Sequence, residues 1–157
     1  SAAITKKRFP NAKFLLYGFP DEHYDSIDEN DIINNWQSDF GIKYMGFSKD
    51  PIDTISQCSV YVLLSYNEGT PRSVLEAMSM GRPIITTNVS GCRETVNEEF
   101  NGFLVPHKDY EYAATCMMKL MDSELRSKMG KASRIYCEQK YNVHEVNSIL
   151  LREMAIK

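Results

Sequence analysis

Short apolar runs alternate with amphipathic segments along the chain. The apolar runs lie at residues 12–18, 42–47, 60–64, 82–87 and 103–105. Segments with helical character lie between or after them, at residues 32–40, 51–57, 71–80, 109–121, 122–139 and 142–155. Strands that alternate with helices predict an α/β fold, a Rossmann-like parallel sheet with helices on both faces. Ligands of such sheets bind at the carboxyl ends of the strands.

The run at 60–64 leads into the most informative stretch of the sequence. Its β-branched and aromatic residues show no polar alternation, which predicts a strand buried on both faces. A polar loop and a helix follow, with Thr70 expected as the N-cap, Pro71 as the first helical residue and Gly81 just past the end at residue 80. The unpaired N–H groups of the first turn, residues 71–74, favour the binding of phosphate.

Two carboxylates bracket this helix start. Glu68 lies in the loop and Glu76 in the helix, with seven residues between them. Gly69 and Pro71 prevent a continuous helix from joining them, so Glu68 is expected to lean over the mouth of the site and Glu76 to rise from the helix beneath it. Taken singly, each is better explained as a solvated glutamate than as a functional one.

Four motifs in order resemble one family. Glu68 and Glu76 are similar to the E-x7-E signature of retaining glycosyltransferases of the GT-B fold, family 4 type, also called glycosyl transferases group 1. The segment 81–87 follows as in that family, 91–96 resembles its G-x-x-E-x-V turn, and 101–106 resembles its N-G-x-L-V-P strand. The resemblance implies that residues 1–157 are a single nucleotide-sugar-binding domain, the C-terminal half of a longer two-domain enzyme whose acceptor-binding half is missing.

The resemblance also implies roles for individual residues. Glu68 would be catalytic and face the hydroxyls of the transferred sugar, and Glu76 would bind the ribose. The full set of expected donor-binding residues is Gly69, Thr70, Pro71, Arg72, Ser73, Val74, Glu76, Gly18, Gly46, Phe47 and Ser48. The loop after Gly18 departs from the family pattern, because proline at position 20 stands where a second glycine is often found. Gly91 and Arg93 are expected to approach the donor, and Glu94 to cap or pair within the next helix.

The expected activity is retaining, hexosyltransferase-like transfer from a nucleoside-diphosphate sugar, in glycan, polysaccharide or glycolipid synthesis. The isolated chain is expected to be inactive without its acceptor domain. Two alternatives stay open at this point: a non-catalytic nucleotide-binding or interaction module, and a sugar-nucleotide epimerase on the same fold.

Composition and charge limit the kinds of partner that the chain is expected to bind. The 157 residues suit one domain, with 43% hydrophobic and 25% charged residues and a net charge of −3. Lys and Arg are scattered rather than striped, so no nucleic-acid partner is expected. No run reaches the length of a membrane span and no signal peptide is evident, which predicts a cytoplasmic protein. For the full-length enzyme a peripheral contact with the inner face of the membrane stays open.

The cysteines and histidines show no metal-ligand spacing. We therefore expect neither a metal nor another cofactor, with the nucleotide sugar as a substrate. Cys58, Cys116 and Cys137 fall in helical patterns and are expected to pack as small apolar residues, whereas Cys92 in a loop is expected to be partly exposed. In the segment 122–139 the predicted inward residues are Leu125, Met129, Ala132 and Ile135.

Overall fold

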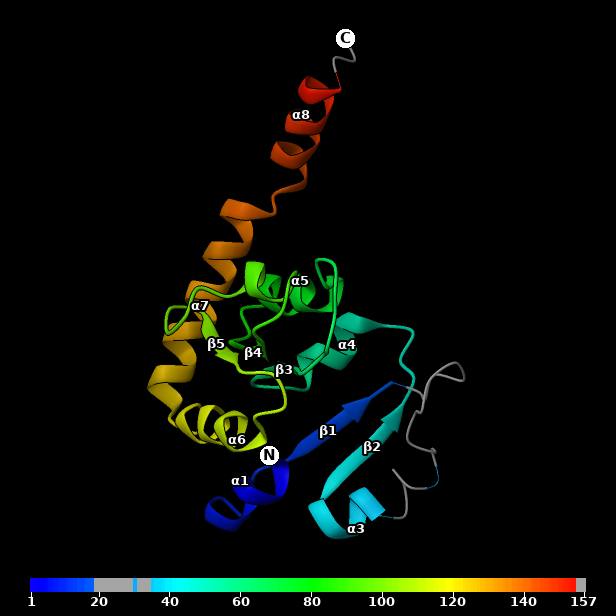
Figure 1. Cartoon of the computed structure of the whole chain (residues 1–157), viewed down its shortest axis with the longest axis vertical. Helices are drawn as coiled ribbons and strands as arrows, with labels where there is room; N and C mark the ends of the chain where they lie inside the picture. Colours follow the sequence, from blue (N-terminus) through cyan, green and yellow to red (C-terminus); the bar gives the residue numbers. More distant parts are fainter. Residues whose placement is uncertain (19–29, 31–34, 155–157) are drawn as a thin grey trace.

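The computed structural model describes residues 1–18, 30 and 35–154 (Figure 1). Its strands are β1 (Phe14–Tyr17), β2 (Ile42–Gly46), β3 (Tyr61–Leu63), β4 (Ile84–Thr87) and β5 (Gly102–Val105). Every pairing between them is parallel. The predicted α/β class and all five predicted strands are confirmed. The start of the expected helix at 32–40 lies outside the described residues, as does the proline at position 20.

The strands form two hydrogen-bonded sheets, β1–β2 and β3–β4–β5. The central strand β4 is wholly buried, whereas β3 lies at an edge, where Val62 and Leu64 keep 36% and 39% of their surface exposed. The prediction that residues 60–64 are buried on both faces is therefore wrong. An apolar run identifies a strand but does not say whether it takes a central or an edge place.

Helices cover both faces of the three-stranded sheet, as predicted. Ile85 and Phe103 pack with α6 on one face, and Ile84 packs with α4 and α5 on the other. The described helices are α1 (Ala2–Arg8), α3 (Gln37–Phe40), α4 (Pro51–Ser56), α5 (Arg72–Ser79), α6 (Tyr110–Lys119), α7 (Ser123–Lys140) and α8 (Val143–Glu153), with a single 3-10 turn η2 (Arg93–Thr95).

The helix α7 packs against α5. It buries a stripe that includes Ser133 and Met129, and Met129 lies in the core cluster with α6. Met129 and Ala132 face inward as predicted, but Ile135 is 49% exposed. The inward prediction for Ile135 is wrong because the buried stripe continues to Tyr136 and Cys137, which contact the core on the α5 side.

The last helix, α8, extends away from the rest of the molecule (Figure 1). It buries none of its residues, and its exposed apolar side chains are Val143, Val146, Ile149, Leu150 and Leu151. None of the helices in the described part of the chain is long and apolar enough to cross a bilayer.

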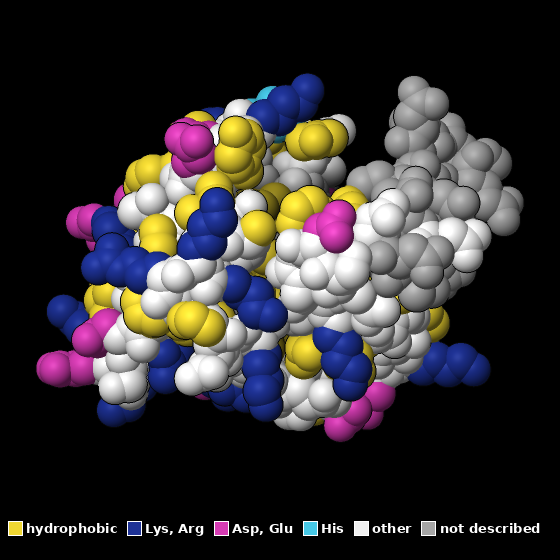
Figure 2. Space-filling view, turned by 90° about the horizontal axis from the view of Figure 1, so that it is seen from below, with side chains coloured by type: hydrophobic (Ala, Val, Ile, Leu, Met, Phe, Trp, Pro, Cys, Tyr) yellow, Lys and Arg dark blue, Asp and Glu magenta, His cyan; other side chains and the backbone are white. Residues whose placement is uncertain are grey.

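The face formed by α1 and α6 carries mixed charge. Figure 2, which looks onto this face, shows Lys and Arg side chains separated by other residues rather than joined in a stripe. Lys6, Lys7 and Arg8 occupy the last turn of α1, where cations complement the partial negative charge of a helix C-terminus.

Candidate functional site

The start of α5 presents free backbone donors. Pro71 takes the N-cap position with an extended backbone, and its carbonyl accepts from the N–H groups of Val74 and Leu75. No side chain caps the helix, so the N–H groups of Arg72 and Ser73 are unpaired among the described residues. The prediction of Thr70 as N-cap is wrong: because Pro71 holds that position, the helix begins one residue later. Of the predicted anion-binding turn, residues 71–74, only the N–H groups of Arg72 and Ser73 remain unpaired among the described residues, because the Val74 N–H already donates to Pro71.

The opposite end of α5 is closed by a turn that the sequence predicts correctly. Gly81 has φ +68, its N–H donates to Met78, and the Arg82 N–H donates to Ala77. These two bonds form a Schellman motif, which requires the left-handed conformation that glycine adopts without strain. The helix is thereby fixed at its far end, and its start is held at the carboxyl edge of the sheet.

Glu68 is held by its own loop. The Ser65 hydroxyl donates a hydrogen bond of 2.7 Å to Glu68 Oε1, and the glutamate side chain is half-buried. One carboxylate oxygen is thus oriented by Ser65 and the other has no partner among the described residues. Sequence reasoning missed Ser65, although its position three residues before Glu68 in a tight polar loop is a signal that could have indicated it.

Glu76 lies in the second turn of α5 and is half-buried. Within the described part of the chain its carboxylate accepts no hydrogen bond and forms no ion pair. The neighbouring Tyr61, at the start of β3, has its pKa raised by burial, and a hydrogen bond with Ser73 opposes that shift. A half-buried carboxylate without a protein partner is free to accept hydrogen bonds from a ligand.

A second loop presses directly on the Glu68 loop. Gly91 has φ +80, and a Cβ atom at this position would lie 1.6 Å from the Gly69 carbonyl oxygen and 2.4 Å from that of Glu68. Contact is therefore backbone against backbone, with no side chain that can move aside. Sequence reasoning placed Gly91 near the donor, and the structure adds that it touches the catalytic candidate's own peptide. The Arg93 Nε donates to Asn88 within this loop.

The other predicted donor residues lie at the ends of β1 and β2. Gly18 and Gly46 are brought together, since the Gly18 N–H donates to the Gly46 carbonyl, and no atom of the described residues lies within 4 Å of either Cβ position. Phe47 is 65% exposed, and the Ser48 hydroxyl binds Asp50 in the turn before α4. These residues end the two-stranded sheet and Glu68 follows the three-stranded one, so the predicted residues form two groups.

A cluster of three exposed side chains adjoins Glu68 and was not predicted. The Tyr66 and His107 rings meet edge to face with centroids 4.7 Å apart, and the Lys108 ammonium lies 5.7 Å from the Tyr66 centroid. The loops after β3 and β5 therefore meet over the end of β4. They supply an aromatic surface and cationic or hydrogen-bonding groups at the carboxyl edge.

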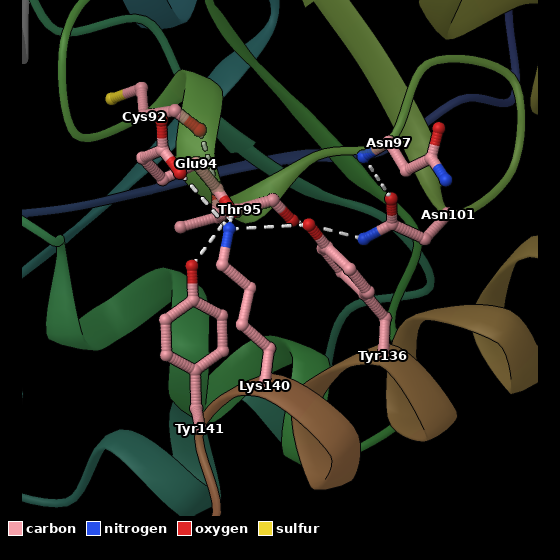
Figure 3. A network of polar contacts seen from close by, with 8 residues as sticks. All are labelled: Cys92, Glu94, Thr95, Asn97, Asn101, Tyr136, Lys140 and Tyr141. Carbon is pink, nitrogen blue, oxygen red and sulfur yellow. Dashed lines mark hydrogen bonds and ion pairs between the residues drawn. The ribbon is translucent and has the colours of Figure 1, made fainter. Parts of the chain in front are cut away.

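The turn after β4 is fixed from two sides (Figure 3). Lys140 and Tyr141, at the end of α7, bind Glu94, and the buried amide of Asn101 binds the backbone of Thr95 and Asn97. The prediction that Glu94 caps or pairs within the next helix is wrong, because its partners come from α7, 46 and 47 positions away in the chain. Such a long-range pairing leaves no local sequence signal.

Cys92, in the same turn, is wholly buried, so the prediction of partial exposure is wrong. The loop folds inward against the core instead of outward. Cys58 and Cys137 are half-buried and Cys116 is fully buried; all four cysteines are free thiols. Burial raises the pKa of Cys116 to about 11 and also raises the pKa values of Cys58 and Cys137. No group of three His, Cys, Asp or Glu able to hold a metal is present among the residues described.

A hollow of about 850 Å³ lies at the other end of α5, beside Gly81. Its three arginines already serve as caps: Arg82 donates to Ser56, Arg126 to Leu120 and Arg134 to Ser79, all carbonyls at helix C-termini. Each guanidinium satisfies a helix end that would otherwise be unpaired. The hollow is therefore explained by helix packing, whereas the uncapped helix start and the two half-buried carboxylates, Glu68 and Glu76, lie at the carboxyl edge.

The family assignment follows from the sequence as a whole. The family model described as "Glycosyl transferases group 1" matches residues 1–136, which include the E-x7-E segment and both loops that adjoin it. The chain belongs to this family. Among curated relatives of this chain, a capsular polysaccharide biosynthesis glycosyltransferase, CapM of Staphylococcus aureus, is 32% identical over 133 residues, covering 84% of this chain and 34% of the relative.

A second relative is the Escherichia coli UDP-Gal:alpha-D-GlcNAc-diphosphoundecaprenol alpha-1,3-galactosyltransferase. It is 28% identical over 144 residues, with 89% of this chain and 36% of the relative covered. A third, from Campylobacter jejuni, is named as an N,N'-diacetylbacillosaminyl-diphospho-undecaprenol alpha-1,3-N-acetylgalactosaminyltransferase and is 30% identical over 132 residues, 83% of this chain and 33% of the relative. The chain spans about a third of the length of these curated relatives.

Solved structures share the fold. A mutant of S. aureus TarM, in complex with fondaparinux, alpha-GlcNAc-glycerol and UDP, superposes with a TM-score of 0.83 at 21% identity, covering 96% of this chain and 30% of that one. Anabaena HepE in complex with UDP gives 0.82 at 19% identity, covering 98% and 44%. The predicted GT-B type of α/β fold is confirmed by these neighbours.

Proposed function

We propose that the chain binds the donor of a retaining glycosyltransferase, a uridine diphosphate sugar. The observation that carries the proposal is the pair Glu68 and Glu76 on either side of the free N–H groups of Arg72 and Ser73. This arrangement offers acceptors for sugar hydroxyls next to donors for a diphosphate, at the carboxyl edge of a parallel sheet. The uridine is inferred from relatives and structural neighbours whose names include UDP.

Each group has a defined part in the proposed reaction. Glu76 accepts hydrogen bonds from the ribose hydroxyls, and bonds of this type to a charged group contribute about 1.5–3 kcal/mol each. Glu68, oriented by Ser65, accepts from hydroxyls of the transferred sugar. The backbone from Gly69 to Ser73 binds the diphosphate and stabilises the negative charge that develops on it as the sugar leaves. Arg72 adds a cation at the same helix start.

The remaining predicted donor residues complete the proposal. Thr70, Pro71 and Val74 shape the loop and the first turn that bind the diphosphate. Gly18 and Gly46 have no atom of the described residues within 4 Å of their Cβ positions, which admits a close approach of the nucleotide. Exposed Phe47, with Ser48 after it, is proposed to lie against the base. No metal takes part, because the helix start supplies the stabilising charge.

The acceptor is proposed to be a saccharide carried on a lipid diphosphate, since two relatives are named for diphosphoundecaprenol-linked substrates. The full enzyme would then work at the inner face of the membrane, with its catalytic parts in the cytoplasm. The chain would form the donor domain and a second domain would hold the acceptor. By itself the chain would bind nucleotide weakly and transfer nothing, because an acceptor must be held at near-attack distance in a closed cleft.

The test uses the full-length enzyme with a panel of nucleoside-diphosphate sugars. We expect one UDP-sugar to raise the melting temperature and to be consumed in the presence of a lipid-diphosphate saccharide, giving a product with retained anomeric configuration by NMR. Conversion of the donor to an epimer without any acceptor would establish the epimerase alternative. Failure of every nucleotide sugar to bind would refute the proposal.

A further inference from the structure

The position of the loop that carries Glu68 and Gly69 depends on the turn that contains Gly91. The backbone of Gly91 touches the carbonyls of Glu68 and Gly69 so closely that even a methyl group cannot fit between them. A shift of this turn toward the loop would push the 68–69 peptide, and a shift away would leave it unsupported. Whatever holds the Gly91 turn therefore also sets the geometry at Glu68.

The end of α7 holds the Gly91 turn at Glu94 (Figure 3). The Lys140 ammonium donates to the Glu94 carbonyl at 2.7 Å and lies 3.0 Å from its carboxylate, and the Tyr141 hydroxyl donates to the same carbonyl at 2.7 Å. Lys140 also binds the Tyr136 hydroxyl at 3.3 Å and lies 5.5 Å from the ring centroids of both tyrosines. The backbone of residue 94 is thus bound by two side chains at once.

This cluster is more than an exposed ion pair. A surface pair between Lys140 and Glu94 alone would contribute little, because water and salt screen it. Here the ammonium contacts two aromatic rings and three oxygen acceptors, two of Glu94 and one of Tyr136. Burial by itself would lower the pKa of Lys140, but the hydrogen bonds to Glu94 and Tyr136 outweigh it and raise the pKa, so the ammonium form is the one that the site binds.

The same helix also contacts the other half of the site. Cys137 approaches the Leu75 carbonyl at 3.6 Å and Arg134 donates to the Ser79 carbonyl, both on α5, which carries Glu76. One helix thus lies behind the Glu76 helix and, through Lys140 and Tyr141, behind the Gly91 turn. These two contacts are independent, so one can be broken while the other stays.

We propose that Lys140 and Tyr141 are positioning residues for sugar transfer, which hold the Gly91 turn against the Glu68–Gly69 peptide without touching the donor. The inference rests on the proposed function. It assigns different effects to the two halves of the site: loss of Lys140 and Tyr141 misplaces Glu68 and lowers kcat, while Glu76 and the start of α5 keep the nucleotide bound.

The test compares Lys140→Met, Tyr141→Phe and the double variant of the full-length enzyme with wild type. We expect kcat of the double variant to fall about 10- to 100-fold, the size expected for the loss of one or two hydrogen bonds that involve a charged group. The dissociation constant of UDP, measured by calorimetry with its stoichiometry, should change less than about threefold. Lys140→Arg should restore kcat, since it keeps a cation and several donors. Lys128→Met is the matched control, because Lys128 is exposed on the same helix and makes no hydrogen bond or ion pair with the described residues.

Hydrogen exchange supplies a readout that does not depend on activity. In Lys140→Met and in Tyr141→Phe, exchange should rise in residues 88–97 and also in residues 66–72, while β5 and α6 keep the protection of wild type. Faster exchange in 88–97 alone would overturn the proposed coupling, as would a double variant with kcat within twofold of wild type. If the wild type binds UDP but transfers no sugar, the proposed function fails, and exchange in 66–72 still decides whether Lys140 and Tyr141 position this loop.

Discussion

Replacement of Gly91 by alanine tests the backbone contact on which the geometry of the site depends. The new Cβ would lie 1.6 Å from the Gly69 oxygen, whereas carbon and oxygen normally approach to about 3.3 Å. The loops must therefore separate by about 1.7 Å, and a misplacement of about 1 Å at a reacting centre can lower the rate about 100-fold. We expect kcat to fall by at least about 100-fold in Gly91→Ala.

The matched control is Gly81→Ala. Gly81 has φ +68 and Gly91 has φ +80, so both variants carry the cost of a left-handed alanine, about 1–2 kcal/mol. At Gly81 the nearest atom to the new Cβ is the Gly130 oxygen at 3.5 Å, an ordinary contact. Steady-state kinetics of sugar transfer report the effect of loop displacement on kcat in each variant. Urea unfolding reports the stability that each variant loses to backbone strain. Gly81→Ala should lose stability and keep kcat. Equal kcat values in the two variants, or a fully active Gly91→Ala, would refute the reasoning.

Four further predictions concern single groups. Glu76→Gln should weaken UDP-sugar binding about 10- to 100-fold with an unchanged melting temperature, because the carboxylate has no partner among the described residues to lose; wild-type affinity by calorimetry would contradict the ribose assignment. Ser65→Ala should lower kcat about tenfold while UDP still binds normally, as the 2.7 Å bond to Glu68 is lost; an unchanged kcat would show that Ser65 does not orient Glu68. Chelation with EDTA should leave transfer unchanged, and recovery that strictly requires Mn²⁺ would contradict it. The pKa of Cys116 is raised from 9.0 to about 11, so the free energy of unfolding should fall as pH rises from about 9 to 11, and Cys116→Ala should flatten that slope in urea titrations; identical slopes would be the contrary result.

Local patterns determined much of this protein. The apolar runs predicted all five strands, and the expected place of Gly81 just past α5 was confirmed because helix capping depends on residues within one turn. The E-x7-E spacing and the following motifs predicted the glycosyltransferase family, which the match to residues 1–136 confirms. Each of these signals lies in a continuous segment.

Tertiary structure decided what depends on contacts between distant segments. β3 lies at the edge of its sheet, which leaves Val62 exposed. The N-cap of α5 is Pro71 rather than Thr70, and Glu94 pairs with a residue of α7. The approach of Gly91 to Gly69 and the meeting of Tyr66 with His107 bring together residues 22 and 41 positions apart. Periodicity and local propensity indicate which face of a helix or strand is apolar. The sequence carries no comparable signal for which two loops will come into contact. Packing of whole helices and strands sets those distances, and here they place Glu68.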